Sequence, residues 1–294
     1  MDKHAYCIIA HKDDYVFKAL LKTIDDSRND IFVLVDKKSK QFDIPQIQKI
    51  CKKSEIIFIP QIKVYWGGFS LVEAEIALFE FARCHAMYSY FHLLSGADMC
   101  IKNQNYIHDF FAQNKGKLFI EGDWSSPCNE QILERIRYYY IQAGRSSLCQ
   151  KLNTIGKFIQ KTFRVNRLKK NQLAIKKGSQ WVSITQEFVD YILNNKEQIF
   201  KLFRRTICSD EIFLQTLAYN SKFKEDLYNS SNVANNMRYI DWMRGKPYTF
   251  NEQDYNEIKS SNALFARKFN YDSSNRLVDM ILDYLNIEQS GEWT

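Results

Sequence analysis

The chain has 294 residues, of which 45% are hydrophobic, 15% aromatic and 26% charged. This composition excludes an extensively disordered or fibrous chain, and the length suits one large α/β unit with a continuous core. The formal net charge of +7 favours anionic partners, which include phosphate-bearing ligands, nucleic acid and acidic membrane surfaces.

Cysteine usage and hydropathy indicate a cell compartment. The seven cysteines form no CxxC pair, and their odd number leaves at least one of them unpaired. A reducing cytoplasm is therefore favoured over a disulfide framework or a structural zinc site. The first apolar run is too short for a signal peptide, and no stretch of about 18 apolar residues occurs. We expect a cytoplasmic protein, with peripheral attachment to the inner face of a membrane as an option.

Three short apolar runs near the start of the chain predict strands over 5–10, 31–35 and 55–59, with helical patterns between them. Strands that alternate with helices in this way form a mostly parallel, buried sheet. Ligands of such sheets bind beyond the carboxyl ends of the strands. This places His11 and Asp36, together with the 61–70 loop, beside a nucleotide.

The pattern continues with a long helix over 71–90, strands over 90–94 and 117–121, and a helix over 186–194. Asp98 follows the 90–94 strand and could either contact substrate or cap the next helix.

A basic segment covers 151–177, with nine basic residues and no acidic one. Within it Leu152, Ile155, Ile159 and Phe163 recur at helical spacing. One interpretation is an amphipathic helix that lies on anionic lipid or grips an acidic acceptor. The other is a solvated basic helix that packs one face on the core.

Six short blocks, spread in order from residue 10 to residue 269, carry a family resemblance. They are Ala10-His11, the run 34–39, Ser95-Gly96-Ala97-Asp98, Gly178-Ser179-Gln180-Trp181, Ser209-Asp210-Glu211 and Phe265-Ala266-Arg267-Lys268-Phe269. In this combination the chain resembles the core-2/I-branching enzyme family, which includes β-1,6-N-acetylglucosaminyltransferases and peptide O-xylosyltransferases. The resemblance implies a GT-A-like α/β fold with a Rossmann-like, mostly parallel central sheet flanked by helices. It also implies a single domain over 1–294, in which 1–125 binds the nucleotide sugar and 126–294 binds the acceptor and carries the catalytic residue.

The resemblance assigns the general base to Glu211, the glutamate of an Asp-Glu motif. A carboxylate within hydrogen-bond reach of an acceptor hydroxyl can take its proton while the oxygen attacks the anomeric carbon. The family inverts configuration, for which one carboxylate suffices. The alternative is that Asp210 and Glu211 only complement a helix dipole.

The leaving diphosphate requires positive charge. The resemblance assigns this role to Lys268, beside Arg267, and to an arginine about 23 residues earlier. A gapless count reaches Gly245, which Arg244 and Lys246 flank. We favour Arg244, because a guanidinium can hold a phosphate at two points.

Metal independence is expected from Asp36-Lys37-Lys38, because metal-dependent relatives of the fold place a second carboxylate where a cation stands here. No metal or other cofactor is therefore predicted. By resemblance Asp36 contacts the uridine of the donor, and the main chain from Ile9 to His11 lines that pocket.

Further donor contacts are expected in the loop of Tyr65, Trp66 and Gly67, where glycine lets the backbone approach a ligand and aromatic rings can stack. A structural turn with buried rings is the alternative. Carboxylates, guanidinium groups and indoles suit a sugar acceptor, and the candidates are Glu121, Asp123, Arg135, Arg137, Trp181 and Trp242. Trp181 could equally belong to the core.

We therefore predict an inverting, metal-independent glycosyltransferase that acts in bacterial surface polysaccharide synthesis. Its donor is a UDP-sugar, with N-acetylglucosamine first and xylose second, and its acceptor is a glycan that could be lipid-linked. The alternative is a non-catalytic basic module that binds nucleic acid or a membrane surface. Nucleic acid is disfavoured as a partner, because aromatic residues do not interleave with the basic segment. Other nucleotide-dependent enzymes are disfavoured because neither GxGxxG nor GxxxxGK[ST] occurs.

Overall fold

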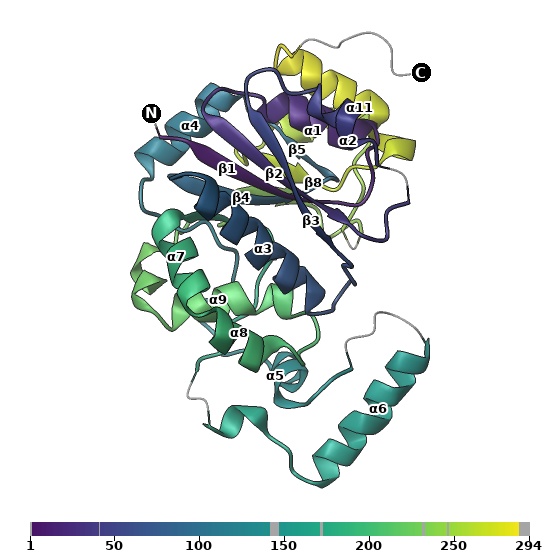
Figure 1. Cartoon of the computed structure of the whole chain (residues 1–294), viewed down its shortest axis with the longest axis vertical. Coiled ribbons are helices and arrows are strands. Elements are labelled where there is room, and N and C mark those ends of the chain that lie inside the picture. The colour runs from purple at the N-terminus through teal and green to yellow at the C-terminus, as the bar shows by residue number, and fades with distance from the viewer. Residues whose placement is uncertain are drawn as a thin grey trace.

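The computed structural model describes residues 2–40, 42–141, 147–170, 173–230, 233–245 and 247–287. Its centre is a sheet of β1 (His4–Ala10), β2 (Asn29–Asp36), β3 (Glu55–Ile62), β4 (Tyr90–Ser95) and β6 (Ser183–Thr185), with helices on both faces (Figure 1). The strand order is β3-β2-β1-β4-β6, and only β6 runs antiparallel to its neighbour.

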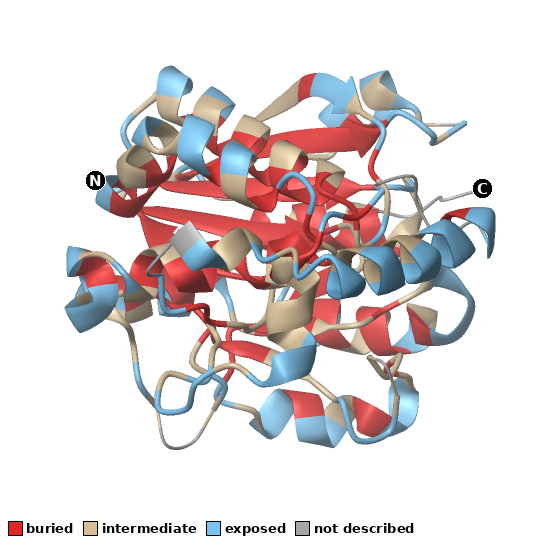
Figure 2. Cartoon of the chain, turned by 90° about the horizontal axis from the view of Figure 1, so that it is seen from below, coloured by how far each residue is buried: buried red, intermediate tan, exposed pale blue. Residues whose placement is uncertain are grey.

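Both faces of the sheet are covered, which explains the uninterrupted apolar runs within β1 and β2 and the full burial of β4. Successive side chains of β1 alternate between two core clusters. One cluster packs under α3 (Ser70–His85) and α7 (Gln186–Asn194), and the other under α1 (Tyr15–Ile24) and α11 (Tyr271–Tyr284). In Figure 2 the central strands are buried along their length, whereas the outward faces of the helices are exposed. The edge strand β3 is largely intermediate or exposed.

A second, three-stranded sheet brings distant segments to the carboxyl end of β4. Its order is β5-β8-β7, from β5 (Asp98–Cys100), β8 (Phe265–Arg267) and β7 (Arg238–Ile240). In the β5–β8 register Asp98 lies opposite Arg267. Two of the sequence blocks are thereby neighbours in space.

The remaining helical elements cover the sheet edges or form the lower part of the molecule in Figure 1. They are α2 (Ile44–Gln48), α4 (Gln104–Gln113), α5 (Glu130–Arg137), α6 (Ser147–Thr162), α8 (Lys196–Phe203), α9 (Phe213–Tyr219), α10 (Tyr255–Ser260) and the short 3₁₀ turns η1 (Arg167–Lys170), η2 (Ser209–Glu211), η3 (Lys222–Asp226) and η4 (Glu252–Asp254). Within the described ranges, none of the helices is both long and apolar enough to traverse a bilayer.

The predicted fold class is confirmed, since the sheet is mostly parallel and the strands predicted over 5–10, 31–35, 55–59 and 90–94 all exist. The strand predicted over 117–121 is wrong. Leu118 and Phe119 make single bridges to two different segments, so no continuous ladder forms. The helix predicted over 71–90 ends at His85, because the chain turns into extended backbone and the Tyr88 amide donates to the Gln186 side chain.

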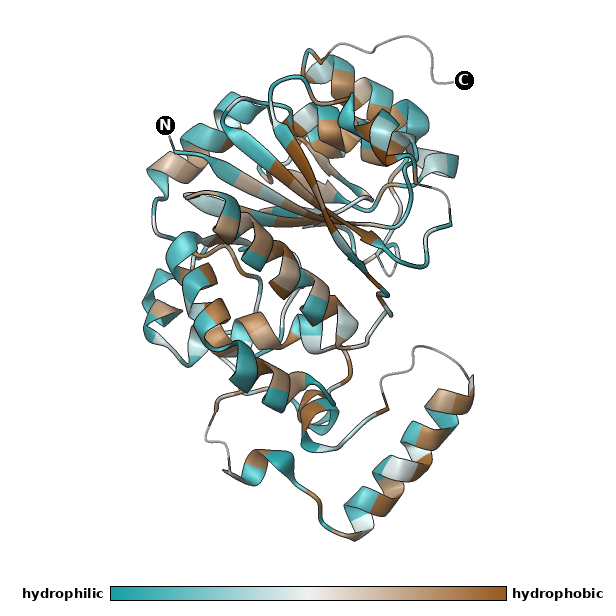
Figure 3. Ribbon diagram, viewed as in Figure 1, coloured by the Kyte–Doolittle hydropathy of each residue, from teal (hydrophilic) through white to brown (hydrophobic). Residues whose placement is uncertain are grey.

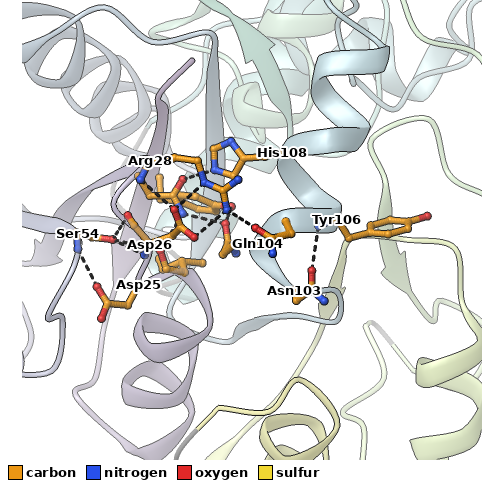
Figure 4. A network of polar contacts seen from close by, with 12 residues as sticks. Asp25, Asp26, Arg28, Ser54, Asn103, Gln104, Tyr106 and His108 are labelled. Atoms are coloured by element: carbon orange, nitrogen blue, oxygen red, sulfur yellow. Dashed lines mark hydrogen bonds and ion pairs between the residues drawn. The ribbon is translucent and has the colours of Figure 1, made fainter. Parts of the chain in front are cut away.

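Buried histidines lie at the amino end of the sheet, opposite the ends that bind ligands. His92 Nε2 is 3.0 Å from His4 Nδ1, and the His4 ring stacks on His108 at 4.0 Å between centroids. Figure 4 shows the adjoining polar network around Arg28, Gln104 and His108. Gln104 of α4 also accepts from the Asn29 side chain at 2.8 Å. Burial lowers the pKa of all three histidines, and that of His108 falls to about 4.

Candidate active site

A cavity of about 1020 Å³ opens at the carboxyl ends of β1, β2 and β4. This is the position at which open α/β sheets bind their ligands. The structure brings many of the predicted residues to its wall: Ile9, His11, Asp36, Trp66, Glu121, Asp123, Trp181, Glu211, Trp242 and Lys268.

Asp36 ends β2 and organises one side of the cavity. Its Oδ1 accepts from the backbone amides of Lys38 at 3.0 Å and Val64 at 3.2 Å, and its Oδ2 lies 3.1 Å from Nδ1 of His11. Burial would raise the pKa of Asp36, but the two amides and the Lys38 charge outweigh it, and the pKa is lowered. Asp36 is thus an ionised carboxylate that can accept hydrogen bonds at the place where a nucleotide is expected.

The neighbouring loop presents one aromatic side chain to the cavity. Trp66 lines the wall and is 62% exposed. Tyr65 lies outside the lining, with its ring 4.7 Å from the Lys38 ammonium. Gly67 has φ +70°, and its carbonyl accepts from the Cys208 amide at 2.9 Å. The loop is therefore fixed against the segment that precedes Asp210 and Glu211.

The positive wall of the cavity comes from the end of β8. Arg267 Nη1 donates to Asp98 Oδ1 at 2.5 Å, and its guanidinium lies 4.3 Å over the Trp181 ring. Asp98 also accepts from the Ser95 amide at 2.7 Å, so it positions Arg267 and does not cap a helix. Lys268 follows directly and lines the cavity. Trp181 is largely buried; it lines the cavity and also belongs to the hydrophobic core.

Arg244 lies elsewhere. Its guanidinium pairs with Asp254 at 2.6 Å and Glu257 at 2.9 Å, and also with Asp241, and Arg244 is not among the residues that line the cavity. A phosphate contact through Arg244 would require it to leave these carboxylates, so that role stays a prediction. Lys246 lies outside the described residues.

Glu211 stands at the opposite side of the cavity, at the end of the η2 turn. Two cations face one of its oxygens: Arg135 Nη1 donates to Oε2 at 3.1 Å, and Lys177 Nζ lies 3.3 Å from the same atom. Within the described part of the chain, Oε1 has no hydrogen-bond partner. The arrangement orients the carboxylate and leaves one oxygen available to accept a proton.

Two further carboxyl groups lie buried behind Glu211. Burial, and then the charge of Glu211, raise the pKa of Asp210 to about 7. Burial and the proximity of Asp210 raise the pKa of Glu75, whose Oε1 accepts from Gln180 Nε2 at 2.9 Å. Asp210 Oδ1 and Glu75 Oε2 have no partner among the described residues. The raised pKa values mean that these two buried groups favour holding a proton.

The predicted acceptor residues divide into two groups. Glu121 and Asp123 line the cavity; Glu121 accepts from the Asn235 amide at 2.8 Å, and Asp123 caps the following turn. Trp242 also lines it and is 60% exposed. Arg137 pairs with Glu130 on α5 and is absent from the lining.

Segment 177–181 forms the floor between Glu121 and Glu211. The Gly178 amide donates to the Glu211 carbonyl at 2.9 Å. A Cβ at this position would lie 1.6 Å from the Glu121 carbonyl oxygen, so only glycine fits. The close contact places Lys177 beside Glu211 and Gln180 beside Glu75.

Sequence reasoning missed Lys177 and Glu75 as site residues. Lys177 is the last residue of the basic segment, and nothing in the charge pattern distinguishes it from the other cations. The only signal was its position directly before the Gly178-Ser179-Gln180-Trp181 block, which carries part of the family resemblance. Glu75 lies within α3, where a lone acid is typical of a solvated face, but its side chain is fully buried.

A family model for the Core-2/I-Branching enzyme matches residues 4–262. The chain belongs to the core-2/I-branching enzyme family. This confirms the predicted family and, with the sheet topology, the α/β, GT-A-like fold class.

Curated members of the family resemble this chain at low identity. The xylosyltransferase sqv-6 of Caenorhabditis briggsae is 26% identical over 283 residues, which cover 86% of this chain and 33% of that protein. Human xylosyltransferase 2 is 23% identical over 309 residues, which cover 95% and 33%. The chain thus spans about a third of the length of these relatives.

Among solved structures, the apo form of mouse xyloside xylosyltransferase 1 aligns with 90% of this chain and 97% of its own. The TM-score is 0.43 and the sequence identity 10%.

Proposed function

We propose that the protein is an inverting glycosyltransferase that moves a sugar from a UDP-sugar to a hydroxyl of a glycan acceptor. One observation carries the proposal: the Glu211 carboxylate shares a single cavity with Asp36 and with the cationic end of β8, in a member of the core-2/I-branching enzyme family. The cavity thus contains a carboxylate that can act as the base, a hydrogen-bond acceptor where the nucleotide is expected, and positive charge for the leaving diphosphate.

The proposed reaction is a single displacement. Glu211 takes the proton of the acceptor hydroxyl as its oxygen forms a bond to the anomeric carbon, and the bond from that carbon to the diphosphate breaks. Lys268 stabilises the negative charge that develops on the departing UDP. Arg135 and Lys177 hold the base in orientation, and Asp36 contacts the uridine.

The relatives' names bear on the donor. Because the curated proteins that this chain resembles are named xylosyltransferases, UDP-xylose becomes the first donor to test and UDP-N-acetylglucosamine the second. We retain a lipid-linked glycan in bacterial surface polysaccharide synthesis as the proposed acceptor class, with the reaction on the cytoplasmic side of the membrane.

We also propose that transfer needs no divalent metal. The support is local: Lys38 Nζ lies 3.4 Å from Asp36 Oδ2, where a positive charge would oppose a bound cation. In the described ranges no three His, Cys, Asp or Glu side chains gather as around a metal ion.

The test is UDP release from a panel of UDP-sugars, with GDP-sugars as control donors, in excess EDTA and in added manganese. Calorimetric binding of UDP supplies a readout that needs no acceptor. Release from one UDP-sugar that survives EDTA supports the whole proposal. Release only with manganese overturns metal independence, and absence of both UDP binding and release overturns the glycosyltransferase assignment.

A further inference from the structure

Helix α6 projects from the body of the protein (Figure 1), and hydrophobic residues recur along it (Figure 3). They form an apolar row that follows helical spacing along α6 into residue 163 and is well exposed: Leu148 67%, Leu152 45%, Ile155 57%, Phe158 72%, Ile159 50% and Phe163 77%. Exposed apolar side chains are common singly, but a contiguous row of this kind marks an interaction surface. For α6 the core-packing interpretation is therefore wrong, although Ile175, further along the basic segment, is buried in the core.

Polar contacts hold α6 in this orientation. Asn153 Oδ1 accepts from the Ile141 amide at 2.8 Å, and the Gln160 side chain bonds both backbone groups of Tyr139. Lys157 pairs with Glu134 of α5. These contacts use the neighbouring side of the helix, so the apolar row faces away from its support.

The charges that α6 itself carries are of one sign. Lys151, Lys161 and Arg164 are exposed on or beside α6, and no acidic residue occurs from 151 to 177. Two copies of such a surface would repel each other, which disfavours self-association through it. An aliphatic row offers little to nucleic acid, where binding relies on stacking and phosphate contacts. Apolar side chains flanked by cations are typical of helices that lie in the interface of an anionic bilayer.

We propose that α6 docks the protein on an anionic lipid surface. The apolar row enters the boundary between headgroups and acyl chains, and Lys151, Lys161 and Arg164 contact the anionic headgroups. Lipid binding of this kind does not depend on the proposed function.

The position of α6 also relates the lipid surface to the cavity. Glu134, which holds Lys157, is adjacent in sequence to Arg135, which holds Glu211. A docked α6 is thus linked through α5 to the residue that orients Glu211, and we expect the sugar of a lipid-carried acceptor to reach the cavity from this end of the protein. This second step rests on the proposed function.

Vesicle co-sedimentation of the full chain tests the docking. The vesicles contain phosphatidylcholine alone or with phosphatidylglycerol, at low and high salt. We expect binding to the anionic vesicles at low salt, and a loss of about tenfold or more in partitioning for the variant Ile155→Ser/Phe158→Ser/Phe163→Ser. A second variant, Lys151→Gln/Lys161→Gln/Arg164→Gln, should lose the preference for anionic lipid.

The matched control is Tyr106→Ser, which removes an exposed aromatic side chain on α4 and should bind as the parent does. Thermal unfolding and UDP binding verify that each variant is folded, and they report on the donor site separately from lipid. Failure of the parent to bind anionic vesicles, or unchanged binding by the apolar triple variant, overturns the proposal. So does a dimer in light scattering that the apolar variant abolishes, since a second copy would then cover the row.

Discussion

Arg135 donates from Nη1 to Oε2 of Glu211 over 3.1 Å, so a residue of α5 orients a carboxylate that lies 76 positions later in the chain. Lys177 approaches the same oxygen from the floor of the cavity at 3.3 Å. Two cations from separate segments thus determine how this carboxylate faces an incoming hydroxyl, and the first prediction concerns it.

Glu211→Gln should retain UDP binding and lose transfer by about 10²–10⁴-fold, because the amide preserves the shape of the side chain but cannot accept the proton. Rates of UDP release, together with calorimetric UDP affinity, measure both effects. Glu130→Gln on α5 is the control and should stay near the parent rate. Full activity of Glu211→Gln would assign the base to another residue.

Lys268→Ala should weaken UDP affinity by about tenfold or more, because a cation that faces the diphosphate is lost. Arg244→Ala should change UDP affinity by less than about twofold, since its guanidinium is held by three carboxylates away from the cavity. Calorimetry of both variants decides between the two cations. An equal loss in Arg244→Ala would show that the arginine leaves its carboxylates to bind phosphate.

Asp210 should make the folded state less stable as the pH rises from acidic values toward neutrality. Its pKa is about 3.8 in the unfolded chain and about 7 in the fold, so the folded state keeps a proton that the unfolded state has lost. The stability from this group is complete below the unfolded pKa and disappears as pH rises from about 4 to about 7.

Replacing Asp210 by asparagine should therefore stabilise the protein at pH 8 by on the order of a few kcal/mol, or a few degrees in Tm, with a smaller gain at pH 5. Melting curves of parent and variant across pH measure the difference. A gain that is independent of pH would contradict proton retention by Asp210.

His108 should have the opposite effect, because it makes the folded state less stable as the pH falls below about 6.5. Burial holds it neutral in the fold down to a pKa of about 4, whereas the unfolded chain takes up a proton near 6.5. Stability is thus lost as pH falls from about 6.5 to about 4. Between pH 6.5 and 5 the loss from this group is about 2 kcal/mol as an upper value.

His108→Gln can still bond Asn29 and should flatten the acid limb of the stability curve, although it removes the ring that stacks on His4. Denaturant unfolding at pH 7 and pH 5 checks this through the difference between the two values. An unchanged difference would place the acid sensitivity in other groups.

The parallel strands were predictable because both of their faces are buried and most of their residues are apolar. The same pattern located Asp36 and His11, which follow directly at the strand ends. Nothing local revealed that Glu75 is buried, because an acid in a helix usually faces solvent. Nor could the spacing of apolar residues in α6 say whether anything covers them.

The surroundings of Arg244 could not be read from the sequence either. Its distance from Lys268 suggested a phosphate contact, but its partners Asp254 and Glu257 lie on η4 and the following helix, and only the fold brings them to it. Contacts between segments separated in sequence are set by tertiary packing, which a count along the chain does not include.

Gly178 has one more consequence. Because its α-carbon rests against the Glu121 carbonyl with no room for a Cβ, the spacing of the two cavity walls is set by main chain against main chain. A slip of the 177–181 segment by one residue would put Lys177 or Ser179 at that contact, and either Cβ would collide. Substitution at Gly178 therefore cannot alter this spacing without a clash, and we expect differences in ligand size to be accommodated by exposed lining side chains such as Trp66 and Trp242.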